Sequence, residues 1–135
     1  MPSAHEALIH LMVITSASDR DMAHLELDRI GSVAKNWPIF IDFDADRLVE
    51  VAQDCQLMLQ EEDGMDNVMM QAARAIPAHL HDTAYAAAVE VAAVDMEMRL
   101  EEVRVLALLR KYLSVDPLAA AAIERATKAR HKMLT

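Results

Sequence analysis

The chain has 135 residues and a mass of 15.0 kDa, the size of one domain with a hydrophobic core. Its 22 acidic and 13 basic residues give a formal charge of −9, which disfavours binding to nucleic acid and to anionic membrane surfaces. A hydrophobic share of 54% excludes a disordered chain, so we expect one folded domain over residues 1–135.

The apolar residues are of the kinds that favour helices. Aromatic residues make up only 4%, and ten methionines join the alanines, leucines, valines and isoleucines. Ala, Leu and Met have high helix propensities, whereas strands prefer β-branched and aromatic residues. Only two glycines and four prolines interrupt the chain. The composition therefore predicts an all-α protein, a single compact bundle of about seven helices.

The first two predicted helices cover residues 3–17 and 22–36. Ser3 and Glu6 form a capping-box pattern at the start of the first helix, because each can satisfy a backbone N–H of the other. Pro38 ends the second helix, since a proline pushes the residue before it out of the α region.

The third helix is predicted over residues 45–60, after an apolar plug at residues 39–43. Asp42 or Asp44 is its cap, and Gly64 is its C-terminal signal. The four remaining helices are predicted at residues 66–76, 79–94, 100–114 and 117–130. The last of them starts with Asp116 as N-cap and a proline at the first helical position.

Two similar acidic segments stand between predicted helices. Each has an Asp, an acid two residues later, a Met three residues later and a Glu seven residues later, and the copies lie 76 residues apart. Apolar positions match on both sides when the copies are aligned. This pattern predicts an internal pseudo-duplication of a helix pair with an acidic corner in each pair. The acids are Asp19, Asp21 and Glu26 in the first copy and Asp95, Glu97 and Glu102 in the second.

Three explanations are open for these acids. If Ala23 and Arg99 are N-cap positions, Glu26 and Glu102 fall at the third helical residue, where a carboxylate reaches free backbone N–H groups, and nearby arginines pair with the rest. Alternatively, all six acids surround a divalent cation, Ca or Mg, because close carboxylates repel by roughly 1 kcal/mol per pair in water and more in protein. The third explanation is a basic protein partner.

Other motifs do not predict a catalytic site. Residues 42–53 resemble the start of an EF-hand loop, but Arg47 and Gln53 stand where Gly and Glu are needed. His5 and His10 are five residues apart, whereas a zinc-protease helix needs four. Two glycines are too few for a phosphate loop or a nucleophile elbow. We predict that the protein is not an enzyme.

Three further features bear on location and surface. The single cysteine, Cys55, fits a reducing cytoplasm, and the most apolar window, residues 84–94, is too short to span a bilayer. Glu90 lies in that window and is expected at the rim of the core, where it can be paired. Met65, Met69 and Met70 form a candidate exposed patch for a partner. We therefore expect a cytoplasmic protein without membrane insertion.

The duplicated acidic corner resembles the TerB family of tellurite-resistance proteins. The matching residues are Ser18 and Asp19 with Met22, Glu26 and Ile30, and Asp95 with Met98, Glu102 and Leu106. The family usually has Gly after the Asp, where this sequence has Arg20 and Met96. The resemblance covers most of the chain. It implies a non-catalytic helical domain in tellurite or chemical-stress resistance, with a metal-related or protein-docking role.

The first functional prediction is thus a TerB-like stress-response domain with an acidic face that binds a divalent cation or docks a partner. The alternative is an interaction module of the co-chaperone kind, without a metal site, whose Met-rich face meets an unknown protein partner.

Overall fold

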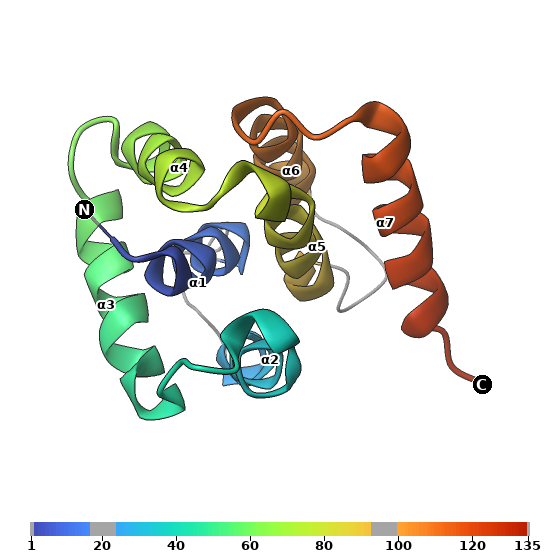
Figure 1. The fold of residues 1–135 in the computed structure, drawn as a ribbon, viewed down its shortest axis with the longest axis horizontal. Coiled ribbons are helices and arrows are strands. Elements are labelled where there is room, and N and C mark those ends of the chain that lie inside the picture. The colour runs from blue at the N-terminus through green and yellow to red at the C-terminus, as the bar shows by residue number, and fades with distance from the viewer. Residues whose placement is uncertain (1, 17–23, 93–99, 135) are drawn as a thin grey trace.

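A computed structural model describes residues 2–16, 24–92 and 100–134 of the chain (Figure 1). Within these ranges the protein contains α-helices and short 3-10 helices and no strand, so the predicted all-α class is confirmed. The α-helices are α1 (Ala4–Ser16), α2 (His24–Asn36), α3 (Leu48–Leu59), α4 (Gly64–Ala75), α5 (His81–Ala92), α6 (Leu100–Tyr112) and α7 (Pro117–Arg130). The 3-10 helices are η1 (Pro38–Phe40), η2 (Ala45–Arg47) and η3 (Ala78–Leu80).

α1 lies at the centre of the bundle. It contacts α2, α3, α4, α5 and α6, and Figure 1 shows the other helices arranged around it. Every residue from 7 to 16 is buried. A helix that is apolar around its whole circumference must be covered on all sides, and this explains why the other helices gather around α1.

Two antiparallel helix pairs form the middle of the molecule. The imidazole of His81, at the start of α5, lies 3.0 Å from the carbonyl oxygen of Leu113, just after α6. Similarly, His5 near the start of α1 lies 2.8 Å from the carbonyl oxygen of Ile39, just after α2. In Figure 1, α1 and α5 run away from the viewer, and α2 and α6 run back. The end of α1, the start of α2, the end of α5 and the start of α6 therefore lie at one end of the bundle.

The two pairs have nearly the same outer helix ends after a shift of 76 residues. α2 and α6 end at Asn36 and Tyr112, which correspond under the shift, and the starts of α1 and α5, Ala4 and His81, differ from it by one residue. Buried positions also correspond, among them Leu8 with Ala84, Ile9 with Tyr85, Val13 with Val89, Ile30 with Leu106 and Val33 with Leu109. The predicted duplication of a helix pair therefore agrees with both the helix ends and the core positions.

α3 and α4 cover one side of α1, and α7 packs on α5 at the other side (Figure 1). Three predicted helix starts are confirmed by their hydrogen bonds. The Ser3 backbone N–H donates to Glu6, and the Glu6 backbone N–H donates to the Ser3 hydroxyl. Asp44 accepts from the backbone N–H of Asp46 at the start of η2, and Asp116 accepts from that of Ala119 in α7. None of the described helices is long and apolar enough to cross a membrane.

The predicted role of Gly64, as the C-terminal signal of the third helix, is wrong. Gly64 is the first residue of α4 and does not end α3, and the left-handed conformation belongs to Asp63, with φ of 57°. A Cβ atom on Gly64 would lie 2.8 Å from Cα of Leu59 and closer still to the carbonyl oxygen of Met58. Glycine is needed there because the two helices approach closely, which the sequence pattern does not reveal.

The segment between α2 and α3 is a 3-10 turn around an aromatic cluster. Trp37 is extended, as a residue before proline should be. Phe40 is buried, and its ring centroid lies 5.6 Å from that of His5 and 5.8 Å from that of Phe43. The predicted apolar plug is thus confirmed in Phe40, whereas Ile41 beside it is 83% exposed.

Candidate functional site

Most of the predicted acidic site lies outside the described residues. Asp19, Asp21, Asp95 and Glu97 fall in residues 17–23 and 93–99. The other two acids, Glu26 and Glu102, lie within three residues of the first described residues of α2 and α6. The predicted N-cap positions, Ala23 and Arg99, lie outside the described residues, so the capping role of the two glutamates stays a prediction. The side chain of Glu26 is also outside the described part, and Glu102 is half-buried.

The described helix ends on either side of the two acidic segments lie at a common end of the bundle. α1 and α5 precede the segments in the chain, α2 and α6 follow them, and α1 contacts both α5 and α6. The N-termini of α2 and α6 add partial positive charge there, which favours nearby carboxylates. In the described ranges no three His, Cys, Asp or Glu side chains converge as metal ligands. Capping, cation binding and partner docking thus stay predictions for the six acids.

A polar cleft lies between α2, α5 and the residue that follows α7. Its volume is about 230 Å³. Its lining is mostly polar, with one indole and one valine as the apolar surfaces. The lining residues are Arg29, Ser32, Val33, Asn36, Trp37, Glu90 and His131. Small-molecule sites are usually more apolar than this lining and use a few convergent polar groups to orient the ligand.

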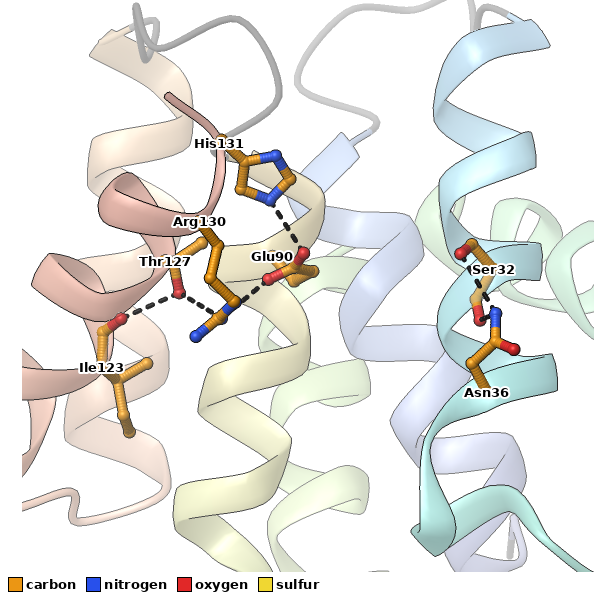
Figure 2. A network of polar contacts seen from close by, with 7 residues as sticks. All are labelled: Ser32, Asn36, Glu90, Ile123, Thr127, Arg130 and His131. Carbon is orange, nitrogen blue, oxygen red and sulfur yellow. Dashed lines mark hydrogen bonds and ion pairs between the residues drawn. The ribbon is translucent and has the colours of Figure 1, made fainter. Parts of the chain in front are cut away.

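Glu90 forms one wall of this cleft and joins α5 to the end of α7 (Figure 2). Its Oε2 accepts from Nη2 of Arg130 at 2.9 Å, and its Oε1 lies 2.8 Å from Nε2 of His131. Nη2 of Arg130 also donates to the hydroxyl of Thr127 at 3.1 Å. Burial acts to raise the pKa of Glu90, but the hydrogen bonds and charges of Arg130 and His131 outweigh burial and lower this pKa. The predicted rim position of Glu90, with a partner, is confirmed.

α2 forms the opposite wall of the cleft. The side-chain amide of Asn36 donates to the carbonyl oxygen of Ser32 at 2.8 Å, one helical turn earlier (Figure 2). Arg29 stands one further turn back, so the three polar side chains follow one face of α2. Trp37 follows the last residue of α2 and is half-buried. Sequence reasoning missed this wall, although its helical spacing could have been read.

A second polar cluster joins α5, α6 and α7. Nη1 of Arg110 donates to the hydroxyl of Tyr85 at 3.0 Å and to Oε1 of Glu124 at 3.3 Å. Burial raises the pKa of the Tyr85 hydroxyl. An open groove of about 620 Å³ runs beside this cluster between α6 and α7. Because Arg110 bridges three helices, we interpret the cluster as structural.

Two reactive side chains are buried in the core and cannot act as a catalytic pair. Burial raises the pKa of the Cys55 thiol to about 12, so the thiolate form is absent at neutral pH. The thiol donates to the carbonyl oxygen of His10 at 3.8 Å, not to its ring. Burial lowers the pKa of His10, and the charges of Glu6 and Asp54 oppose this effect.

No protein-family model matches this chain, and none of the curated proteins or solved structures compared with it is significantly similar. The resemblance to the TerB family therefore stays a prediction that depends on the two acidic segments.

Proposed function

We propose that this protein is a non-catalytic, TerB-like domain of stress or tellurite resistance that binds a divalent cation, Ca or Mg, at its acidic end. The observation that supports the proposal most is the common position of the helix ends that flank the two acidic segments. Six carboxylates distributed over two such segments can reach one another only if the segments start from the same end of the bundle.

The chemistry of the acids also fits this proposal. All six ligands are carboxylates, and oxygen donors are what calcium and magnesium take in proteins. Carboxylates at short distance repel, so a bound cation would remove an unfavourable interaction in the folded state. The same cation would stabilise the fold in proportion to the logarithm of its concentration.

Calorimetric titration with calcium, magnesium and manganese tests the proposal. We expect a saturable heat with at least one cation and a rise in melting temperature in its presence. Asp95→Asn and Glu102→Gln should each weaken binding by about tenfold or more, since each removes one charged ligand. Asp42→Asn and Glu50→Gln are matched controls, because they remove the same charges from exposed positions near and on α3. They should leave the affinity unchanged.

The alternative is an interaction module without a metal site, and one feature of the surface favours it. Ile41, Val49 and Leu57 are 83%, 51% and 62% exposed at and beside α3. The Met-rich patch predicted from sequence is only partly formed, because Met69 is fully buried and packs in the core. If no cation produces heat or a higher melting temperature, the metal proposal fails and docking through this apolar face becomes the better account.

A further inference from the structure

The cleft between α2 and Glu90 differs in charge from the chain as a whole. The chain carries a formal charge of −9, whereas the described residues that line the cleft include one guanidinium, Arg29, one imidazole, His131, and one carboxylate, Glu90. Both oxygens of that carboxylate are engaged, one by His131 and the other by Arg130. Within the described lining, the carboxylate is thus already engaged by two partners, and Arg29 supplies a guanidinium.

The donors of the cleft are suited to a carboxylate. A guanidinium presents several N–H donors in one plane, so Arg29 can keep a neighbour within the protein and still donate to a ligand. Nε2 of His131 faces Glu90, which leaves its other ring nitrogen to face away from that contact (Figure 2). The guanidinium of Arg29 therefore supplies the N–H donors for one small anion, and the ring of His131 lies on the facing wall.

The rest of the lining indicates the body of the ligand. Trp37 and the buried Val33 supply an aromatic and an aliphatic surface in the same cleft as Arg29. A flat apolar group can stack on an indole while its charged end meets the guanidinium. A volume of about 230 Å³ is below the range of drug-sized ligands and suits a single ring with a carboxylate.

We propose that this cleft binds a small organic carboxylate that carries a planar ring. The carboxylate meets Arg29, with His131 beside it, and the ring lies against Trp37 and Val33. This site uses none of the six acids of the proposed cation site, so the two proposals stand or fall separately.

Trp37 makes the test direct, because it is the only tryptophan of the chain. The natural protein is titrated with benzoate while the tryptophan emission is recorded. We expect a saturable change in emission. Benzamide has the same shape without the charge, and it should bind about tenfold more weakly or not at all.

Variants then locate the site. Arg29→Gln should weaken benzoate binding by about tenfold, the loss expected for one charge-assisted contact. Arg74→Gln removes the same charge from an exposed position on α4 and should leave binding unchanged. Circular dichroism shows whether Arg29→Gln folds. The comparison of benzoate with benzamide needs no variant and decides the proposal even if that variant does not fold.

The proposal is overturned if benzoate gives no saturable change up to its solubility, or if benzamide binds equally well. Equal affinity of folded Arg29→Gln and the natural protein would also overturn it. As an independent readout, the indole N–H resonance of Trp37 should shift with benzoate and not with acetate, because acetate lacks the ring.

Discussion

α1 and α5 occupy equivalent places in the two helix pairs, yet their side chains differ in size. α1 presents Leu8, Leu11 and Met12 where α5 presents Ala84, Ala87 and Ala88, and all six are buried. α1 is enclosed by five helices, and its large side chains fill the space among them. α5 is slender and lets α7 pack close to its backbone. The comparison shows that one backbone plan can be used for two different packing solutions.

The two helices differ most at one pair of positions, Ile14 in α1 and Glu90 in α5. Ile14 is fully buried among apolar neighbours, whereas Glu90 lies at the rim and accepts from Arg130 and His131. The position tolerates a carboxylate only where α7 brings cationic partners to it. The environment, and not the position in the repeat, therefore decides which residue is compatible.

Exchanging these two residue types should cause the largest loss of folding stability. Ile14→Glu places a carboxylate in the apolar centre without a partner, which costs several kcal/mol, a large part of the stability of a typical domain. We expect no cooperative thermal unfolding for this variant at neutral pH, measured by circular dichroism. Glu90→Leu is the matched control and should stay folded, because Arg130 is half-exposed and can be hydrated. An Ile14→Glu protein with an unchanged melting temperature would contradict this account.

Changing side-chain volume at one equivalent pair should have the next largest effect. Leu11→Ala removes a fully buried side chain and should lower the free energy of unfolding by about 3 kcal/mol. Ala87→Leu adds volume where helices pack closely and should cost about 2 kcal/mol. Urea denaturation measures both values. If Ala87→Leu instead stabilises the protein, α5 has unfilled space around it and the proposed close packing of α7 is wrong.

The smallest effect should be the pH dependence that comes from His10 in α1. Burial lowers the pKa of His10 in the folded state below the ordinary value of 6.5, so the unfolded chain takes up the proton first. The free energy of unfolding should therefore fall as the pH drops below about 6.5 and stop falling below the folded pKa. Each unit by which the folded and unfolded pKa values differ corresponds to about 1.4 kcal/mol of stability.

His10→Gln should flatten the stability profile in this window, measured by urea denaturation at several pH values. Glu90 acts in a separate window, because its folded pKa is lowered from 4.5 and its stabilisation is lost only as the pH falls below that value. A slope between pH 6.5 and 5 that persists in His10→Gln would assign the effect to another group.

The sequence was sufficient for the parts of the fold that depend on local chemistry. The cap at Asp116, the capping box of Ser3 and Glu6, and the extended Trp37 before Pro38 all follow from neighbours along the chain. Gly64 was wrongly predicted to end α3. A glycine is needed at this position because a side chain would collide with the end of α3, and not because of its backbone angles. A contact of that kind depends on how two helices meet.

The two candidate sites also differ in how far the sequence alone could reveal them. Periodicity and composition alone determined an all-helical chain with a repeated acidic sequence segment, because helix propensity and capping act over a few residues. Only the tertiary structure brought Arg29 and Trp37 of the first repeat to Glu90 of the second and to His131 beyond α7. No spacing along the chain encodes that meeting, since it results from how α2, α5 and α7 cover the buried central helix.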